Sequence, residues 1–242
     1  MFEPSRIMVA LDVDELADAK KIVEGLAESG VTFKIGNQLG TYEGWQNAIE
    51  FVHHYGARIF CDTKFKDIPQ TVNKSSRAIT RHRPDFFNVM ADTDPVALKE
   101  AVAGMESAVK EFSMSRPIIL GVTVLTSIDN QTSVSIYGGS SEEKVLQFAA
   151  AAAQSGLDGV VCSANEAKML KSNPLTESLL LVTPGIRPVW AASGDQSRVI
   201  TPKQAIEAGA DYLVIGRPIT QPPPEIGSPK NALNKILEEI NG

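Results

Sequence analysis

The stretch Arg58-Ile-Phe-Cys-Asp-Thr-Lys-Phe-Lys-Asp-Ile-Pro-Gln-Thr-Val72 joins a strand pattern to the beginning of a helix. Its first half has the β-branched and aromatic composition of a strand, and Pro69 ends that pattern. Asp62 and Lys64 lie two residues apart, so we expect both side chains on one face of the strand. Asp67 follows just past the end of the strand.

A lysine between two carboxylates is favoured in its protonated form, because each negative charge stabilises the ammonium. Asp62, Lys64 and Asp67 therefore form a poised proton donor on a rigid strand. A structural ion pair followed by an aspartate at a helix start explains the same residues, since ion-pair networks are not always functional. These residues alone leave both interpretations open.

The change from strand to helix recurs along the chain. Short apolar runs rich in β-branched residues predict eight strands, at 7–13, 32–36, 58–65, 85–91, 117–125, 159–164, 179–183 and 212–216. Helical patterns lie between most of these runs, most clearly at 14–28, 94–112, 141–154, 202–208 and 229–240. This alternation implies parallel pairing, and a chain of 242 residues suits a closed (β/α)8 TIM barrel of the α/β class. An open doubly wound sheet is the alternative.

Composition and charge narrow the possible functions. The net charge of −6 argues against nucleic acid or an anionic membrane as a partner, because both require a basic surface. No apolar run has the length of a membrane span, and no signal peptide is visible at the start. The two cysteines lie in different predicted strands and are expected to be buried free thiols. We expect one domain over residues 1–242 and a cytoplasmic location.

Charged residues collect where the predicted strands end. Asp12 closes the first strand, Lys34 lies in the second, and Asp62 and Lys64 lie in the third. In a barrel the C-terminal ends of the strands form one face, so these four groups are expected to converge there. Such a convergence is unfavourable unless the charges satisfy one another and serve a ligand.

The last two predicted strands indicate a phosphate site. The eighth runs into Gly216 and Arg217, which offer close backbone approach and a forked donor suited to phosphate. The segment at about 185–199 has no helical period, carries Arg187 and Gln196, and is interpreted as a lid. A turn glycine beside a surface arginine, and a merely disordered connection, are the alternatives.

No cofactor motif is present in the sequence. There is no Gly-x-Gly-x-x-Gly after a strand, no Gly-Lys-Ser/Thr phosphate loop and no His/Cys cluster with metal spacing. The chemistry is therefore expected to come from side chains and the substrate, or from a divalent ion on the carboxylates. Thr126 or Ser127, at the end of the fifth strand, is a weak candidate for contact with a ligand.

Together these residues resemble the orotidine 5′-monophosphate decarboxylase family. The matching pieces are Leu11-Asp-Val13, Phe33-Lys-Ile-Gly36, Asp62-Thr-Lys-Phe-Lys-Asp-Ile-Pro-Gln-Thr71, Val124-Leu-Thr-Ser127, Thr183-Pro-Gly-Ile-Arg187, Gly194-Asp-Gln-Ser-Arg198 and Val214-Ile-Gly-Arg-Pro-Ile-Thr220. The resemblance implies a cofactor-free decarboxylase that makes UMP in the last step of pyrimidine synthesis, with no metal.

The resemblance also implies roles for individual residues. Lys64 would protonate C6 of the pyrimidine, and Asp62 would lie beside the departing carboxylate and orient Lys64. Lys34 with Asp12 would hold the ribose hydroxyls and complete a charge network with Asp62 and Lys64, so Lys34 is also counted as catalytic. The segment that would reach into the neighbouring site of a homodimer comprises Asp67, Ile68 and Thr71, with Asp67 counted as catalytic. The remaining substrate-binding residues would be Thr126 at the pyrimidine, Pro184, and the phosphate ligands Arg187, Gln196, Gly216 and Arg217.

Two other functions remain open at this point. One is a magnesium-dependent sugar-phosphate decarboxylase or aldolase of the same superfamily, which uses a similar Asp-x-Lys-x-x-Asp motif around a metal. The combination of Ile68, Pro69 and Thr71, and the predicted lid that carries Gln196, argue against this metal-dependent function. The other is a barrel that only binds a phosphorylated ligand as a sensor or scaffold.

Overall fold

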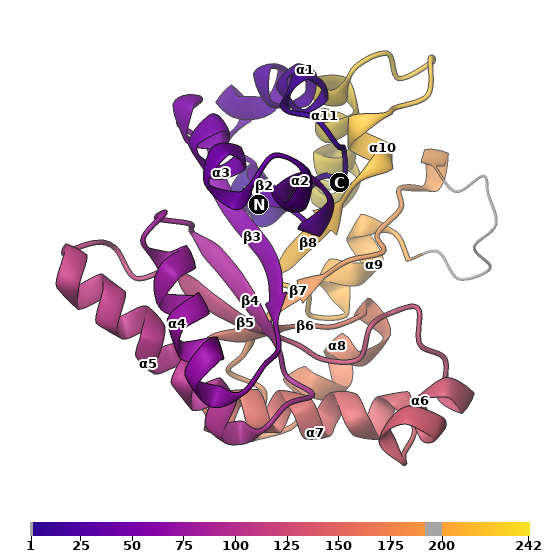
Figure 1. Cartoon of the computed structure of the whole chain (residues 1–242). Coiled ribbons are helices and arrows are strands. Elements are labelled where there is room, and N and C mark those ends of the chain that lie inside the picture. The colour runs from indigo at the N-terminus through magenta and orange to yellow at the C-terminus, as the bar shows by residue number, and fades with distance from the viewer. Residues whose placement is uncertain (1, 192–199) are drawn as a thin grey trace. The chain divides into compact units, whose positions relative to one another are not determined.

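The computed structural model describes residues 2–191 and 200–242. Its strands are hydrogen-bonded in chain order and close into a barrel, and the pairs with a defined register are parallel. The predicted (β/α)8 barrel is confirmed, and the open doubly wound sheet was wrong. The strands, labelled in Figure 1, are β1 Ile7–Leu11, β2 Thr32–Ile35, β3 Arg58–Phe65, β4 Phe86–Met90, β5 Ile118–Val122, β6 Gly159–Val161, β7 Leu180–Thr183 and β8 Tyr212–Ile215.

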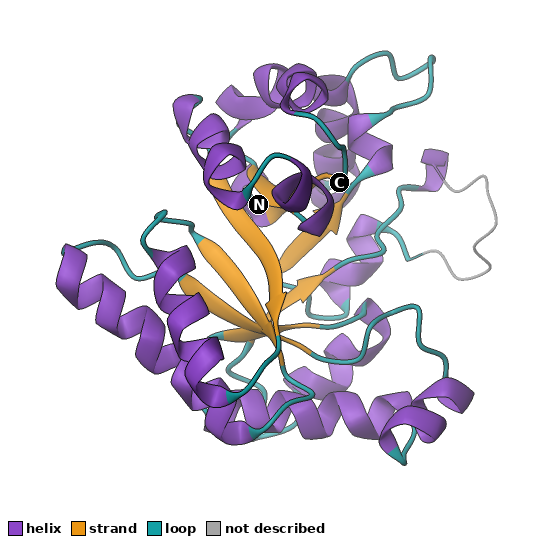
Figure 2. Ribbon diagram, in the orientation of Figure 1, coloured by secondary structure: helices purple, strands orange, loops and turns teal. Residues whose placement is uncertain are grey.

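Helices separate the strands, as Figure 2 shows. The α-helices are α1 Leu16–Leu26, α2 Asn37–Tyr42, α3 Trp45–His54, α4 Pro69–Thr80, α5 Pro95–Phe112, α6 Asn130–Tyr137, α7 Ser141–Gln154, α8 Ala164–Lys171, α9 Pro202–Glu207, α10 Arg217–Thr220 and α11 Pro229–Asn241. The described residues also form three short 3₁₀ helices, η1 Pro4–Arg6, η2 Ala27–Ser29 and η3 Val189–Ala191.

Helix starts follow from local sequence chemistry. Proline, which lacks an N–H and has a helix-compatible φ, occupies the first turn of α4, α5, α9, α10 and α11. The side chain of Asp94 caps α5 by accepting from the N–H of Val96. Ser140 and Glu143 form a reciprocal capping box at α7. These signals explain why α5, α7, α9 and α11 begin within one residue of the helical patterns predicted for them.

Several strands end earlier than the apolar runs suggest. β1 ends at Leu11 instead of residue 13, so Asp12 already lies in the loop that follows it. β6 ends at Val161 because Ser163 is needed as the N-cap of α8, where its partner is Glu166. Shorter strands place the polar residues that follow them at the C-terminal edge of the barrel.

The chain divides into two compact units, and β3 contributes to both. The first takes residues up to Asp62 and from Thr183 onward, and the second takes Thr63–Val182. Within the first unit β1 pairs with β2 and β8, and within the second β4, β5, β6 and β7 pair in order. The expectation of one domain over residues 1–242 stays a prediction.

Each unit has its own buried apolar side chains. β1 is buried throughout, as expected for a strand covered on both faces, and Phe33 adds bulk in the first unit. Phe86 and Phe87 are fully buried in the second. Cys61 and Cys162 are both buried and form no disulfide, as predicted. Within the described part of the chain, no helix combines the length and the hydropathy needed to cross a membrane.

A glycine fixes the helix that follows the Asp67 loop. A Cβ at Gly104 of α5 would lie 2.1 Å from the carbonyl oxygen of Asn73 in α4, so only glycine permits this approach. The side chain of Asn73 also donates to the carbonyl and the carboxylate of Glu100. α4, seen beside α5 in Figure 1, is thereby held against it immediately after Asp67 and Ile68.

Candidate active site

Lys34 lies between two carboxylates in the first unit. Its Nζ is 3.2 Å from Oδ1 of Asp12 and 3.4 Å from Oδ2 of Asp62. The side chains of Lys34 and Asp62 are 11% and 14% exposed, whereas that of Asp12 is 61% exposed. The structure therefore brings together three of the four charged groups that the sequence predicted to converge.

Strand register explains this arrangement. Ala10, Lys34 and Phe60 are level across β1, β2 and β3. Asp12 and Asp62 each lie two residues further along, so the long side chain of Lys34 extends one step along the strands to reach both. A shorter cation in this position of β2 would not reach the carboxylates.

Gly36 leaves the space that the Lys34 ammonium occupies. Gly36 lies two residues after Lys34, just as Asp12 and Asp62 lie two residues after the residues of β1 and β3 that are level with Lys34. A Cβ at Gly36 would lie 3.2 Å from Nζ of Lys34 and 3.7 Å from Oδ1 of Asp12. A side chain here would displace the ammonium, so the ion pairs, and not a turn, favour glycine at this position.

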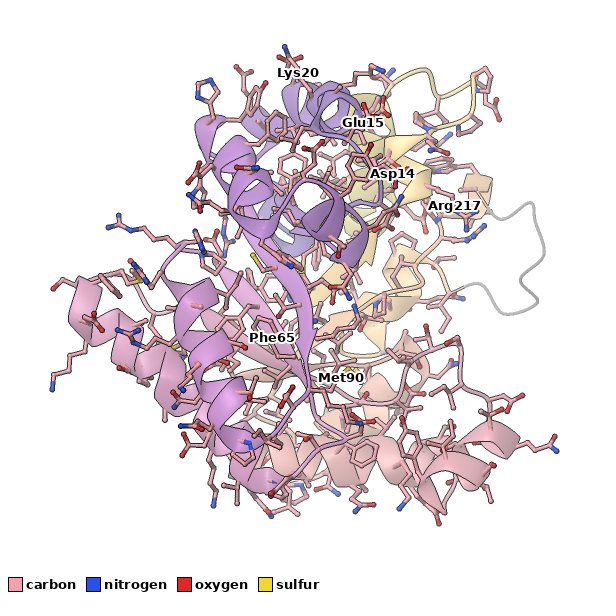
Figure 3. The ribbon with its side chains drawn as sticks, viewed as in Figure 1. Asp14, Glu15, Lys20, Phe65, Met90 and Arg217 are labelled. Carbon is pink, nitrogen blue, oxygen red and sulfur yellow. The ribbon has the colours of Figure 1, made fainter. Side chains whose placement is uncertain are left out.

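The predicted phosphate residues after β8 lie near this group of charges. A Cβ built on Gly216 would be 3.6 Å from Oδ2 of Asp12, which places the Gly216 backbone beside that carboxylate. Arg217 begins α10 and is exposed, and Figure 3 labels it together with Asp14 of the loop after β1. Both predicted residues are thus at the edge of the first unit that carries Asp12.

Lys64 has an unusual backbone in the second unit. Its φ is +49°, in the left-handed region, although it lies within β3. Its N–H donates to Oδ1 of Asn88 at 2.7 Å, and the hydroxyl of Thr63 donates to the carbonyl of Asn88 at 2.6 Å. The regular alternation used to predict that Asp62 and Lys64 share a face does not apply at a residue with this φ. Their mutual placement therefore stays a prediction.

The segment after β3 is exposed. Ile68 is 65% exposed, which is high for a large apolar side chain, and its N–H donates to Oδ1 of Asp67 at 2.7 Å. Thr71, also exposed, lies in the first turn of α4 and donates its N–H to the carbonyl of Ile68. These three residues, predicted to reach a partner subunit, are at the surface of the second unit.

Of the ligand-binding residues predicted after β5 and β7, all but Gln196 lie within the described residues. Thr126 is exposed in the loop between β5 and α6. Pro184 and Arg187 are half-buried after β7, and the N–H of Arg187 donates to the carbonyl of Ile200. Gln196 lies outside the described residues, so the predicted lid at about 185–199 is described only as far as residue 191.

The described beginning of that segment is fixed against α11. The N–H of Val189 hydrogen-bonds to Glu239, whose pKa is raised by burial despite this bond. Nζ of Lys235 lies 5.8 Å from the centre of the Trp190 ring. Two successive residues of η3 therefore contact the last helix.

Sequence reasoning missed a second set of charges, around Asp92. Its side chain is 7% exposed, and its Oδ2 accepts from Nζ of Lys66 at 2.8 Å and from the hydroxyl of Tyr137 at 3.2 Å. The pKa of Tyr137 is raised by burial and further by Asp92. These contacts connect the loops after β3 and β4 to α6.

Asn88 was missed as well, although the sequence contains a signal. It is a single amide within the apolar run Phe86-Phe-Asn-Val-Met90, and it is completely buried. A buried polar group in such a run must have a hydrogen-bond partner. Among the described residues, no group of three or more His, Cys, Asp or Glu side chains is arranged to hold a metal ion.

A family model matches residues 5–233, and its description is "Orotidine 5'-phosphate decarboxylase / HUMPS family". The chain belongs to this family.

Curated relatives of this family are similar over nearly the whole chain. Orotidine 5'-phosphate decarboxylase from Aliivibrio fischeri (strain MJ11) is 41% identical over 96% of this chain and 95% of its own. The enzyme of the same name from Heliobacterium modesticaldum (strain ATCC 51547 / Ice1) is 39% identical over 97% of this chain and 95% of its own. These relatives carry the name of a carboxy-lyase.

Solved structures agree with the family assignment. Orotidine 5'-phosphate decarboxylase from Lactobacillus acidophilus has a TM-score of 0.81 and 34% identity, and the match covers 98% of this chain and 99% of that one. An uncharacterized conserved protein from Geobacillus kaustophilus has a TM-score of 0.82 and 30% identity, covering 97% and 100%.

Proposed function

We propose that this protein decarboxylates orotidine 5′-monophosphate to UMP and carbon dioxide, without a cofactor, as the last step of pyrimidine nucleotide synthesis. Family membership and the names of the relatives support the reaction. The single structural observation that carries the proposal is that Asp12 and Asp62 hold the Lys34 ammonium between them. Asp62 lies two residues before Lys64 in the sequence.

The chemistry requires a cation at C6 of the pyrimidine. When the C6–carboxylate bond breaks, its electron pair stays on C6 in the ring plane, with no adjacent carbonyl to accept it. We assign Lys64 as the group that stabilises this carbanion and then gives it a proton, leaving a neutral amine that solvent reprotonates. Preorganised charge is effective here, because it costs no reorganisation at the moment of reaction.

The three charges of the first unit would assist in two ways. Asp62 is mostly buried, so its charge would act in a site with little water, beside the departing carboxylate. Lys34 would neutralise Asp62 and, with the exposed Asp12, hold the ribose hydroxyls. Asp62 would also destabilise the ground state by its repulsion of the substrate carboxylate.

The rest of the substrate would be bound by residues at the ends of the other strands. Thr126 would contact the pyrimidine, and Pro184 would line the site. The phosphate would be held by Arg187, Gln196, Gly216 and Arg217. Binding energy from the phosphate can assist the distant reacting carbon, if it is used to close the site around the substrate.

We further propose a homodimer in the cytoplasm, each chain a single domain. Ile68 is an exposed apolar side chain, and a partner subunit would cover it. Asp67 and Thr71 lie beside it and would reach the partner's site, with Asp67 contributing to catalysis there.

Spectroscopy tests the proposal directly. The orotate chromophore is followed by ultraviolet absorbance after adding orotidine 5′-monophosphate in the presence of a chelator. Wild type should consume the substrate and Lys64→Ala should not, although both should bind UMP. Lys74→Ala, at an exposed lysine of α4, is the matched control and should behave as wild type.

Other outcomes would assign other functions. UMP binding without turnover by wild type would indicate a sensor. Activity only with magnesium and a sugar phosphate would place the chain among the metal-using enzymes of the superfamily. Normal turnover by Lys64→Ala would refute the assigned proton donor.

A further inference from the structure

Lys64 is the exception among the left-handed residues of this structure. Within the described part of the chain, three non-glycine residues have positive φ: Lys64 at +49°, Arg83 at +56° and Ser113 at +47°. Ser113 is the C-cap of α5 and Arg83 follows α4, where left-handed residues commonly end helices. Lys64 instead lies inside β3. A strand gives no local reason for this conformation.

A left-handed backbone at lysine is strained and persists only when the surroundings enforce it. Asn88 provides that enforcement from the neighbouring strand β4. Its Oδ1 accepts the N–H of Lys64 at 2.7 Å, and its carbonyl accepts the hydroxyl of Thr63 at 2.6 Å. Thr63 and Lys64, consecutive residues near the end of β3, are thereby both bonded to Asn88. Figure 3 marks this place by the labels of Phe65 and Met90, the last residues of β3 and β4.

Asn88 is suited to hold a backbone in place. It is completely buried and lies in the middle of β4, level with Leu120 of β5. A buried amide oxygen that already has its donor has little freedom to move, because losing the bond leaves it unsatisfied. Because Asn88 lies on a strand and not in a loop, it holds the Lys64 backbone more precisely than a loop residue would.

We infer that Asn88 is a positioning residue: its side-chain oxygen holds the Lys64 backbone in the left-handed conformation and so directs the Lys64 ammonium at the reacting carbon. This inference rests on the proposed role of Lys64 as proton donor. The direction of a Cβ follows from φ and ψ, so a return of Lys64 to extended φ would redirect its whole side chain. Asn88 itself need not touch the substrate.

Three variants separate positioning from general stability. Asn88→Ala removes the acceptor for the Lys64 N–H, and Asn88→Asp keeps an oxygen there. Thr63→Val is the matched control, because it removes the other hydrogen bond to Asn88 and leaves the Lys64 bond intact. For each variant the kcat, the KM, the dissociation constant for UMP and the hydrogen-exchange rate of the Lys64 amide are measured on the full chain.

The expected result is selective loss of turnover. Asn88→Ala should lower kcat by roughly ten- to a hundredfold, the size expected when a reacting group is displaced by about an ångström. Its UMP affinity should be unchanged, and its Lys64 amide should exchange faster. Asn88→Asp should recover much of the lost kcat. Thr63→Val should lower the melting temperature but not kcat.

The outcomes distinguish this inference from the function on which it rests. If wild type does not decarboxylate, or Lys64→Ala does, the proposed function fails. If wild type decarboxylates the substrate and Lys64→Ala does not, but Asn88→Ala keeps its kcat, the positioning role is refuted. Equal losses of kcat in Asn88→Ala and Thr63→Val would also refute it, since that pattern indicates a structural role. Should Asn88→Ala not fold, Asn88→Asp decides: its oxygen should keep most of the wild-type kcat and slow exchange of the Lys64 amide, and loss of either would refute the inference.

Discussion

Nζ of Lys34 lies 3.4 Å from Oδ2 of Asp62, and the two side chains are only 11% and 14% exposed. Each charge is largely removed from water and is compensated by the other. Loss of either partner would leave a buried charge without its counter-ion, which is far more costly than loss of a pair at the surface.

Substitutions at Lys34 and at Asp12 should therefore differ sharply in how far they lower the free energy of unfolding. Lys34→Met should lower the free energy of unfolding by roughly 3 kcal/mol, because Asp62 loses its buried counter-ion. Asp12→Asn should cost no more than about 1 kcal/mol, since Asp12 is 61% exposed. Urea denaturation of both variants measures the difference. Similar small losses in the two would show that the Lys34–Asp62 pair contributes little.

Gly36→Ala should impair activity more than stability. The new Cβ would lie 3.2 Å from the Lys34 ammonium, which can move aside at little cost because it ends a flexible side chain. We expect a fall in kcat/KM of about tenfold from the displaced charge and little change in melting temperature.

Gly25→Ala is the matched control for Gly36→Ala. A Cβ at Gly25, within α1, meets nothing within 4 Å. Alanine there should stabilise the protein by about 0.5–1 kcal/mol and leave kcat/KM unchanged. Steady-state kinetics and thermal unfolding of the two variants provide the comparison. An active Gly36→Ala enzyme would mean that the Lys34 ammonium can shift without consequence.

The contacts of Asp92 predict that loss of its ion pair lowers stability more than loss of its hydrogen bond to Tyr137. Lys66→Met should cost roughly 2–4 kcal/mol, because the Asp92 carboxylate is 7% exposed and would lose its ion pair. Tyr137→Phe removes one hydrogen bond to the same oxygen and should cost about 1 kcal/mol. Chemical denaturation at neutral pH tests both values, and a larger loss for Tyr137→Phe would contradict them.

The same cluster can be examined by titration. Burial is the main cause of the raised pKa of Tyr137, and Asp92 adds to it. Asp92→Asn should therefore lower the pKa of Tyr137 only part of the way to its ordinary value. Difference ultraviolet titration against Tyr137→Phe isolates this hydroxyl. A complete return to the ordinary value would assign the whole effect to Asp92.

The capping box of α7 should make stability depend on acid pH. The Glu143 carboxylate accepts from the N–H and hydroxyl of Ser140, and these bonds lower its pKa. A group whose pKa is lowered by folding stabilises above its unfolded pKa, and that contribution is lost as the pH falls through the folded value. The loss should therefore occur on the acid side of the ordinary glutamate range.

Glu143→Gln preserves the capping geometry but cannot titrate. Its free energy of unfolding should decline less than that of wild type between neutral and acid pH, while the two proteins remain similar near neutrality. Urea denaturation at a series of pH values measures the two curves. Parallel curves would show that Glu143 does not contribute to the pH dependence.

Much of the barrel and of one charge group could be predicted from the sequence, because each polar residue follows or interrupts an apolar run. Asp12 comes directly after β1, and Lys34 and Asp62 lie in runs with clear strand composition. The parallel arrangement then requires the ends of these strands to meet. The contacts of Lys34 with both carboxylates follow from this logic.

The remaining features depend on tertiary structure that no local pattern specifies. The positive φ of Lys64 was not predictable, since an apolar run with alternating residues implies extended backbone throughout. Lys66, Asp92 and Tyr137 are separated by 26 and 45 residues in the sequence, and nothing in their local patterns pairs them. Asn88 gave a signal, but only the structure identifies the group that it binds.

The burial of Cys61 and Cys162 has a practical consequence. Because both native thiols are inaccessible, a cysteine introduced at the surface would be the preferred site of reaction with a maleimide dye or a nitroxide. Val189, 70% exposed at the start of the predicted lid, is a natural position for such a probe. A labelled Val189→Cys enzyme would test the predicted lid, because a rearrangement on ligand binding would change its fluorescence or paramagnetic signal, and no native cysteine has to be removed first.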